Sequence, residues 1–554
     1  MPTLFTNLVC SYRQGLARTR NAAKERPMKL LFALPLWLIP AFAYAQTPAN
    51  PQIMADVQAG QFPQAEQLAA ATGDPLVEKL VNYFRLLSPG GASADEIQSF
   101  ITQNPDWPMQ GLLKLREEQA SGIYQPPAPT FTPDFIAKSD ALHDQGQDQQ
   151  AARLWEDNGQ AAMSSASAGQ QLMFWPAQNE LARALLMTGD AKDAYQVIAA
   201  VAPPQAALEQ NLDRDFLAGF VQLQFLNDPA QAATWFQQLA RASSAVITQA
   251  RAYYWLARSS TGTEAQQDYA RAAAYPTTFY GQLAALAEGQ TPQQLALRIQ
   301  SLPEPAITMQ DALHFGLEEL PRAALLLVQM GDAHDAQIFL NRIGYTALDD
   351  QSRLMAAKLA LGLGFPQSAV SIARQAGIAG QMLVRQGWPI PYNPPSNIIE
   401  PSIALGIMRQ ESSFNTTAIS GSGAIGLMQL MPGTARDVSR RYGLPDDDLF
   451  NPAQNMALGS TYLAHQINNF GVCIPLAIAA YNAGPGNVAN WLGTYGNPGL
   501  GSQPGGADIL TWIEEIPFNQ TRDYVERVSE NITIYRALLT GAATSPISAC
   551  GNQK

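Results

Sequence analysis

The chain has 554 residues, which is more than one ordinary hydrophobic core accommodates, so at least two domains are expected. Hydrophobic residues make up 47% of the composition, and this share excludes a largely disordered chain. The formal charge is −12 at pH 7, so no surplus of Lys and Arg exists to replace counterions on phosphates, and nucleic acid is excluded as a partner. An uncharged sugar polymer, which is contacted through hydrogen bonds and aromatic stacking, remains compatible with this composition.

The first 45 residues have the pattern of an export signal. Lys29 precedes the apolar run LLFALPLWLIPAFAYA, which ends in a cleavage pattern of the A-x-A type. The run is short and contains two prolines, so a permanent membrane span is disfavoured. We therefore predict a cleaved signal peptide over residues 1–45, with Met28 as the favoured translation start, and a periplasmic mature protein without a stable membrane anchor. The removed segment carries six basic side chains and one acidic one, so cleavage changes the formal charge from −12 to −17.

The cysteine count is compatible with a single disulfide bond. Signal cleavage would remove Cys10 and leave Cys473 and Cys550. In an oxidising compartment these two can pair and fasten the C-terminal tail to the domain that carries Cys473. The alternative is two unpaired thiols, one buried and one on a mobile tail. We favour the disulfide.

Residues 46–386 are rich in Ala, Leu and Gln, and their hydrophobic residues recur with a helical period. A pattern of a glycine, four residues and an alanine occurs five times, starting at Gly60, Gly146, Gly189, Gly331 and Gly364. The glycine can end one helix in a left-handed conformation, and the small alanine lets the next helix pack closely. We therefore predict an α-superhelix of helical hairpins. Its curved surface would bind a polymer or a partner protein, or it would serve only as a scaffold.

The composition changes after this region. Residues 387–395 read GWPIPYNPP and contain four prolines, which predicts a linker because proline does not continue a helix. Residues 396–554 then alternate helical runs with loops rich in Gly, Ser and Asn. We expect them to form a second, separate domain.

The first candidate catalytic residue lies at the end of the helical run IALGIMRQE. Ile403, Ile407 and Met408 share one helical face, and Glu411 lies on the same stripe. A carboxyl group among apolar residues has a raised pKa and donates a proton near neutral pH. Cleavage of a glycosidic bond requires such a donor for the departing oxygen. Taken alone, Glu411 would more often be a helix-end carboxylate or a salt-bridge partner.

Four neighbouring segments favour the catalytic interpretation. They are ESSFN from Glu411, GSGAIGLMQLMPGTA from Gly421, AYNAGPGNV from Ala480 and WIEEIPFNQTRDYV from Trp512. In kind and order this set resembles the soluble lytic murein transglycosylase family, over about 150 C-terminal residues. The resemblance implies a predominantly all-α protein, in which a lysozyme-like helical catalytic domain follows the superhelix. It also implies peptidoglycan glycan strands as the substrate.

The resemblance assigns roles to individual residues. Glu411 matches the acid/base catalyst. Six further positions match residues around the scissile bond, which are Ser420, Gln429, Met431, Tyr481, Asn482 and Glu514. The glycines of GSGAIG are expected to let the backbone approach a bulky glycan. Arg522 and Tyr524 are expected to brace the final helix rather than contact substrate.

The implied reaction breaks the bond between the muramic sugar and N-acetylglucosamine. Glu411 protonates the leaving oxygen and then accepts the proton of the C6 hydroxyl, which closes a 1,6-anhydro ring. No second carboxylate is evident opposite Glu411, and most hydrolases use two. The alternatives are a hydrolytic muramidase and a non-catalytic envelope scaffold that binds glycan.

No cofactor is expected. The four histidines, His143, His314, His334 and His465, show no paired spacing for a metal site, and no phosphate-binding loop is present. We expect a monomer, and envelope proteins that bind it are not identified by the sequence.

Overall fold

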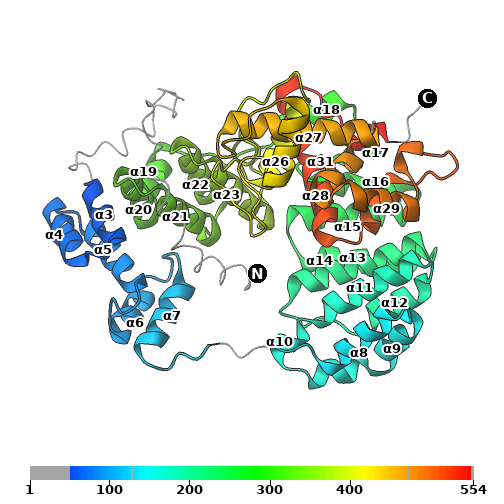
Figure 1. Ribbon diagram of the computed structural model, residues 1–554, viewed down its shortest axis with the longest axis horizontal. Coiled ribbons are helices and arrows are strands. Elements are labelled where there is room, and N and C mark those ends of the chain that lie inside the picture. The colour runs from blue at the N-terminus through cyan, green and yellow to red at the C-terminus, as the bar shows by residue number, and fades with distance from the viewer. Residues whose placement is uncertain (1–49, 127–129, 472, 551–554) are drawn as a thin grey trace. The chain divides into compact units, whose positions relative to one another are not determined.

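The computed structural model describes residues 50–126, 130–471 and 473–550. Over these residues the chain is helical with no strand, and the only β-type pairings are isolated bridges (Figure 1). The predicted all-α fold class is therefore confirmed. The predicted signal peptide, together with Met28 and Cys10, lies outside the described residues. Among the helices in the described ranges, none has the length and apolarity that a membrane crossing requires.

The region before the proline-rich segment is a succession of short helices joined by tight turns. Neighbouring helices pack as antiparallel pairs, for example α8 with α9, α11 with α12, α20 with α21 and α22 with α23. The helices are α3 (Pro51–Gln58), α4 (Phe62–Thr72), α5 (Pro75–Leu87), α6 (Ala94–Gln103), α7 (Gln110–Ala120), α8 (Asp134–Asp144), α9 (Asp148–Ser165), α10 (Ala168–Gln171), α11 (Phe174–Met187), α12 (Ala191–Ala200), α13 (Leu208–Gln224), α14 (Pro229–Ala242), α15 (Val246–Arg258), α16 (Gly262–Ala273), α17 (Phe279–Ala287), α18 (Pro292–Gln300), α19 (Met309–Leu317), α20 (Glu319–Gln329), α21 (Ala333–Thr346), α22 (Asp350–Gly362), α23 (Pro366–Ile378) and α24 (Val384–Gly387).

The glycine–alanine repeat has the structural role that the sequence predicts. All five glycines have a positive φ between 70° and 87° and lie in the turn between two helices. The alanine five positions later is fully buried in every copy, which holds for Ala65, Ala151, Ala194, Ala336 and Ala369. Each copy therefore makes one helical hairpin with a close contact between its two helices.

Other hairpins form without the repeat. The turn between α13 and α14 contains Asn227, which has a φ of 54° in place of a glycine, and asparagine tolerates this conformation better than most residues. The glycine–alanine pattern misses this hairpin, which is one of several helix pairs between the copies at Gly189 and Gly331.

Residues 388–400 contain no helix and separate α24 from the second group of helices. The apolar core nevertheless continues across this segment, because one cluster of buried side chains extends from Ile136 to Ala543. The division into domains at 46–386, 387–395 and 396–554 stays a prediction. The later helices are α25 (Pro401–Glu411), α26 (Pro432–Tyr442), α27 (Pro452–Phe470), α28 (Ile474–Ala483), α29 (Pro485–Tyr495), η1 (Pro498–Leu500), α30 (Ile509–Glu515), α31 (Asn519–Thr540) and η2 (Pro546–Ala549).

Cys473 and Cys550, the two cysteines among the described residues, are joined. Cys473, at the start of α28, forms a disulfide bond with Cys550, just after η2. The bond fastens the C-terminal tail to the core, because Cys473 is fully buried. This is the pairing that the sequence favours over two free thiols.

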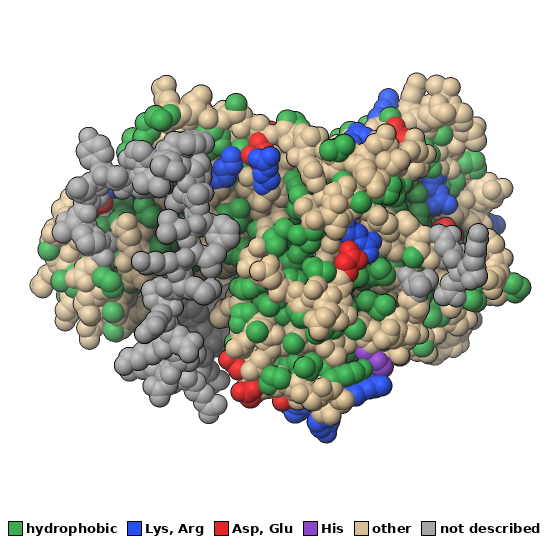
Figure 2. Space-filling view, turned by 90° about the horizontal axis from the view of Figure 1, so that it is seen from above, with side chains coloured by type: hydrophobic (Ala, Val, Ile, Leu, Met, Phe, Trp, Pro, Cys, Tyr) green, Lys and Arg blue, Asp and Glu red, His purple; other side chains and the backbone are tan. Residues whose placement is uncertain are grey.

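The surface has few charged groups. On the face that Figure 2 shows, Lys, Arg, Asp and Glu form small separate groups between apolar and neutral polar side chains. This agrees with a composition in which only 14% of residues are charged.

Candidate active site

Glu411 is the last residue of α25, a helix that is enclosed on all sides. Every residue from Ser402 to Arg409 is buried, so the apolar stripe predicted from the sequence is only one part of a helix that is buried over most of its length. Gly406 allows α31 to pack against α25, because a Cβ at this position would lie 3.0 Å from Ile532 Cγ1. The close packing of α25 against α31 fixes the end of the helix from which Glu411 projects.

A buried polar contact fixes the relative position of the same two helices. Arg409 Nη1 and Trp388 Nε1 both donate to Asn531 Oδ1 on α31, each at 2.8 Å. The Arg409 guanidinium also lies 4.0 Å from the centre of the Trp388 ring and donates from Nε to the Gly387 carbonyl. Burial lowers the pKa of Arg409 to about 9. The segment that precedes α25 is thereby tied to α31.

The loop that follows Glu411 folds back over the end of α25. Ser412 Oγ donates to the Leu427 carbonyl at 2.8 Å. The loop contains three of the five non-glycine residues with positive φ in the described part of the chain, namely Ser413 at 50°, Phe414 at 70° and Gln429 at 47°. Such backbone is costly and tends to occur at functional sites, where surrounding contacts hold it.

Asn455 on α27 supplies many of those contacts. This fully buried side chain accepts from the Met428 amide at 2.8 Å and donates to the carbonyls of Ile425 and Leu449, each at 2.9 Å. The sequence analysis did not identify Asn455, because a single asparagine within a helical run gives no signal of its contacts.

The glycines of this loop do not all serve the purpose expected of them. Gly426 has a φ of 80°, and a Cβ there would lie 2.4 Å from Asn455 Nδ2 and 2.5 Å from the Leu449 carbonyl oxygen. Packing inside the protein, rather than the expected approach of a glycan, therefore explains why position 426 is a glycine. Gly421 and Gly423 have open space where a Cβ would be.

Two tyrosines lie beside Glu411. Tyr524 Oη, from α31, donates to Glu411 Oε1 at 2.6 Å. Tyr481 Oη, from α28, donates to the Met428 carbonyl at 2.8 Å, and its pKa is raised by burial and by the Glu411 charge. Tyr524 was expected to brace the final helix rather than contact substrate, and its hydroxyl is in addition bonded to the candidate catalyst. The segment TRDYV indicated that α31 belongs with the site, but the sequence could not show which side chain faces Glu411.

The carboxyl group of Glu411 has an environment suited to proton transfer. Burial raises its pKa from 4.5 to about 7, and the hydrogen bond from Tyr524 acts in the opposite direction. These two influences leave the group close to half protonated at neutral pH. A carboxyl in this condition can donate a proton and later accept one.

The other residues expected at the site differ in their placement. Gln429 Nε2 donates to the carbonyls of Ala418 and Gly426 at 3.1 and 2.9 Å, so its amide is used in holding the loop. Ser420 Oγ accepts from the Ala424 amide at 2.9 Å in the same loop. Met431 is 43% exposed immediately before α26.

Asn482, on α28 next to Tyr481, is half-buried. Its Oδ1 accepts from Thr521 Oγ1 of α31 at 2.7 Å. This contact joins the two helices that carry Tyr481 and Tyr524.

Glu514 is the residue whose placement differs most from its expected role. Its side chain is fully buried on α30, where it accepts a hydrogen bond from Tyr280 and pairs with Arg251 at 2.5 Å. Both partners belong to the helices before the proline-rich segment. This placement contradicts direct contact with substrate, because the carboxylate has no exposed surface. Arg522 does brace the start of α31, as expected, by donating to the Ile516 carbonyl at 3.0 Å.

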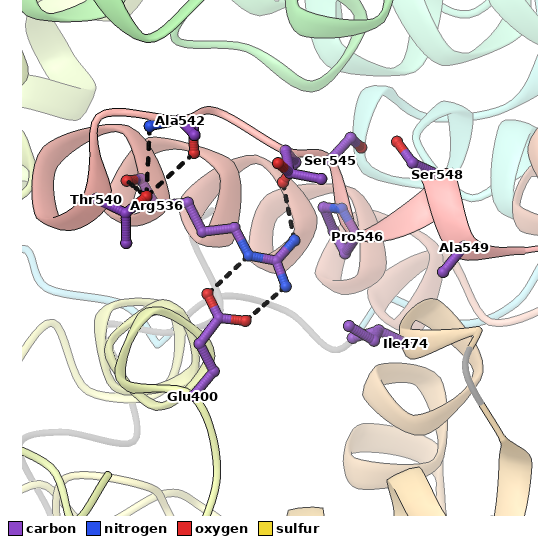
Figure 3. Close-up of a pocket in the computed structure, with 10 residues that line it drawn as sticks. Glu400, Ile474, Arg536, Thr540, Ala542, Ser545, Pro546, Ser548 and Ala549 are labelled. Atoms are coloured by element: carbon purple, nitrogen blue, oxygen red, sulfur yellow. Dashed lines mark hydrogen bonds and ion pairs between the residues drawn. The ribbon is translucent and has the colours of Figure 1, made fainter. Parts of the chain in front are cut away.

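A cavity elsewhere in the C-terminal region is distinct from this site. It has a volume of about 510 Å³ and lies beside η2, where Arg536 and Glu400 form a two-pronged ion pair with distances of 2.8 and 2.6 Å (Figure 3). None of its lining residues belongs to the four sequence segments that surround Glu411. The chemistry expected of the chain therefore does not involve this cavity.

The part of the chain that contains Glu411 is similar in sequence to known proteins. Residues 395–499 match the family described as Transglycosylase SLT domain. The soluble lytic murein transglycosylase of Salmonella typhimurium is 36% identical over 184 residues, which are 31% of this chain and 27% of that protein. The protein of the same name from Escherichia coli K12 is 36% identical over 174 residues, which are 29% and 26% of the two chains. The matched segment thus spans about a quarter of the length of these relatives.

The fold is similar to that of two solved structures over most of the chain. One is an inactive mutant of the lytic transglycosylase Slt from Pseudomonas aeruginosa, with 22% identity, a TM-score of 0.56 and coverage of 91% of this chain and 99% of that chain. The other is a 70-kDa soluble lytic transglycosylase in complex with bulgecin A, with 18% identity, a TM-score of 0.51 and coverage of 93% and 99%. At these identities the likeness concerns the fold alone. Residues 395–499, which include Glu411, are thus similar to the transglycosylase SLT domain, and the all-α fold is similar to that of these two structures.

Proposed function

We propose that the chain is a peptidoglycan lytic transglycosylase that cleaves the β-1,4 bond between N-acetylmuramic acid and N-acetylglucosamine. The observation that carries this proposal is the carboxyl of Glu411, whose pKa is raised to about 7 by burial and which accepts a hydrogen bond from Tyr524. Its position within the segment that matches the SLT domain family supports the same conclusion.

The reaction has two proton transfers at one carboxyl group. Protonated Glu411 gives its proton to the glycosidic oxygen, and the bond from that oxygen to the anomeric carbon of the muramic sugar breaks. The acetamido group of the same sugar stabilises the positive charge that develops. Glu411, now ionised, accepts the proton of the C6 hydroxyl, whose oxygen then bonds to the anomeric carbon. The product is a 1,6-anhydromuramoyl end, and no water is consumed.

Two tyrosines support this use of Glu411. A hydrogen bond from Tyr524 stabilises the ionised form and keeps the pKa from rising further, which makes the first transfer, from Glu411 to the glycosidic oxygen, easier. Tyr481 holds the Met428 carbonyl, which belongs to the loop beside Glu411. We propose that the substrate lies against this loop and α28, in contact with Ser420, Gln429, Met431, Tyr481 and Asn482. Glu514 is not part of this proposal.

A hydrolytic muramidase is the second candidate. Such an enzyme generally needs a second carboxylate to activate water or to form a covalent intermediate. In the described residues, the influences that act on the Glu411 pKa are burial and the Tyr524 hydroxyl, and neither is a carboxylate. This favours the intramolecular reaction. A glycan-binding scaffold without activity is the third candidate, and it gives no reason for a carboxyl group held near pKa 7.

We further propose that the mature protein acts in the periplasm as a monomer and needs no cofactor. The disulfide bond between Cys473 and Cys550 supports an oxidising compartment, because such bonds are rare in proteins of the cytosol.

Mass spectrometry of the fragments released from purified peptidoglycan tests the proposal. The chain without its predicted signal peptide should release muropeptides that are one water lighter than hydrolysed ones, and Glu411→Gln should release none. Reducing ends would establish a muramidase instead. Binding to peptidoglycan without release by either protein would favour the scaffold.

A further inference from the structure

A network of buried and half-buried charged side chains joins the superhelix, which comprises α3 to α24, to α30 and α31. The superhelical side contributes two arginines and one aspartate, and the C-terminal side contributes two arginines and three glutamates. The two sides therefore have opposite net charges, and the network as a whole is neutral. Its members are Arg183, Asp213, Arg251, Glu514, Arg522, Glu526, Arg527 and Glu530.

Arg251 occupies the central position in this network. Its Nη2 lies 2.5 Å from Glu514 Oε2 on α30 and 3.8 Å from Glu526 Oε1 on α31, so one side chain from α15 bridges both C-terminal helices. The guanidinium also lies 3.3 Å from the centre of the Phe216 ring. Burial lowers the pKa of Arg251, but the carboxylates of Glu514 and Glu526 raise it overall. The side chain is thus charged and held from three directions.

Neighbouring groups of the superhelix complete the contact. The Tyr280 hydroxyl on α17 donates to Glu514, and the Phe279 amide donates to Glu530 Oε2 at 3.0 Å. Arg183 Nη1 on α11 donates to the Glu514 carbonyl at 2.8 Å. A buried carboxylate without such partners is strongly unfavourable, so the carboxylates of Glu514 and Glu530 favour the position of α30 and α31 in which these partners are in reach.

The same helix, α31, presents its other side to the candidate catalyst. Arg522, Glu526 and Glu530 recur every four residues and face the network. Tyr524 and Asn531, which are seven residues apart and so share one face of the helix, contact α25, where Tyr524 is bonded to Glu411. A rotation or a slide of α31 would therefore move the Tyr524 hydroxyl relative to the Glu411 carboxyl.

We propose that Arg251 is a positioning residue, which sets α31 through Glu514 and Glu526 and thereby holds the Tyr524 hydroxyl against Glu411. The consequence for catalysis rests on the proposed function, but the effect on the Tyr524–Glu411 contact does not. The superhelix is then more than a scaffold or a binding surface, since it contributes to the geometry of the active site.

The experiment measures the Glu411 carboxyl directly and then measures the rate. Carbon-13 NMR of protein labelled at the glutamate side-chain carboxyl gives the Glu411 pKa, with its resonance assigned by its absence in Glu411→Gln. The titratable groups that face Glu411 are Tyr524 from α31 and Tyr481 from α28, and both titrate far above this range. The pH profile of glycan release is recorded for the same proteins.

Tyr524→Phe gives the reference effect. Loss of its hydrogen bond should raise the Glu411 pKa, because that bond favours the ionised form. Arg251→Met should raise it in the same direction by a smaller amount. It should also move the basic limb of the kcat profile to higher pH and lower kcat on the order of tenfold, with KM unchanged, because a displaced catalytic contact slows the chemical step.

Two further variants separate positioning from stability. Arg251→Lys keeps the charge but replaces the guanidinium, whose Nη2 contacts both Glu514 and Glu526, by a single ammonium, and it should give an intermediate pKa shift. Arg322→Met removes a comparable ion pair within the superhelix, 2.9 Å from Asp74, and should lower thermal stability without changing the Glu411 pKa.

An unchanged Glu411 pKa and pH profile in folded Arg251→Met and Arg251→Lys would overturn the proposal. Failure of both variants to fold would also overturn it, because Arg251 would then serve the fold as such. If the unmodified protein releases no glycan fragments, the proposed function fails, and the NMR titration still decides the role of Arg251.

Discussion

The superhelical helices and the loop around Glu411 use left-handed backbone in different ways. In the superhelix the repeat glycines have a positive φ but open space where a Cβ would be, so each acts only as a turn. In the C-terminal loop, Ser413, Phe414 and Gln429 adopt this backbone without being glycines, and Gly426 is packed against Asn455. Conformational strain is thus concentrated beside Glu411. The superhelix is thus built for regular stacking, whereas the loop is held in an unfavourable conformation by specific contacts.

The largest expected effect is on the proposed activity. Glu411→Gln should lower the rate of glycan release by about a thousandfold, because general acid–base catalysis contributes on this order. The rate is measured as soluble fragments released from purified peptidoglycan. The matched control is Glu78→Gln, which changes an exposed glutamate of α5 and should leave the rate unchanged. A rate for Glu411→Gln above one tenth of the normal rate would show that the site lies elsewhere.

The second largest expected effect is the loss of folding stability when the disulfide bond of the C-terminal region is removed. Cys473 and Cys550 are 77 residues apart in the chain, and closing a loop of this size stabilises the folded state by about 4 kcal/mol. Cys473→Ser combined with Cys550→Ser should lose this amount, as measured by the urea midpoint. A reducing agent should have the same effect on the unmodified protein and none on the double variant. Equal midpoints with and without reductant would contradict the prediction.

The pH dependence of stability tests the cost of placing Glu411 in its site. Its folded pKa of about 7 lies above the value of 4.5 that applies to an exposed glutamate. Between these values the folded protein binds more protons than the unfolded chain, so stability falls as pH rises from about 4.5 to about 7. The loss amounts to about 3 kcal/mol.

Glu411→Gln removes this titration and should be more stable than the unmodified protein at pH 8 but not at pH 4. Urea unfolding at the two pH values measures the difference. The superhelix offers the control, since Glu78→Gln should change stability little at either pH. If Glu411→Gln and the unmodified protein were equally stable at pH 8, the folded structure would not raise the pKa of the Glu411 carboxyl.

The two regions also differ in how far the sequence predicts them. The hairpins of the superhelix follow from the glycine–alanine repeat, because turn conformation and close helix packing depend on residues only five positions apart. The hairpin at Asn227 was missed, since it uses a different residue for the same turn. Glu411, the surrounding motifs and the pairing of Cys473 with Cys550 were also identified in advance.

What could not be predicted depends on contacts between distant parts of the chain. Tyr524 was expected to brace α31, but its hydroxyl also bonds Glu411, and Glu514 was expected near the substrate, but its side chain is buried beside Arg251. Tyr524 bonds Glu411, 113 residues earlier in the chain, and Glu514 bonds Tyr280, 234 residues earlier. A motif shows that a residue type is needed, but the packing of α30 and α31 against other helices decides which side of each helix faces the site.

The smallest predicted effect is the difference in stability cost between two glycine substitutions, one from each region. Gly364→Ala places a side chain at a φ of 83° with open space around it, so it should cost about 1 kcal/mol from backbone strain alone. Gly426→Ala adds to a similar strain the overlap of its Cβ with Asn455 and the Leu449 carbonyl, which should cost about 2 kcal/mol more. Urea midpoints of the two variants measure the difference, with Gly421→Ala as a control that meets neither obstacle. Gly426→Ala should also slow glycan release, because the displaced Asn455 holds the Met428 amide, and the Met428 carbonyl in turn accepts from Tyr481. Equal costs for Gly364→Ala and Gly426→Ala would mean that the loop beside Glu411 yields as readily as a superhelical turn, and the contrast between the two regions would then be lost.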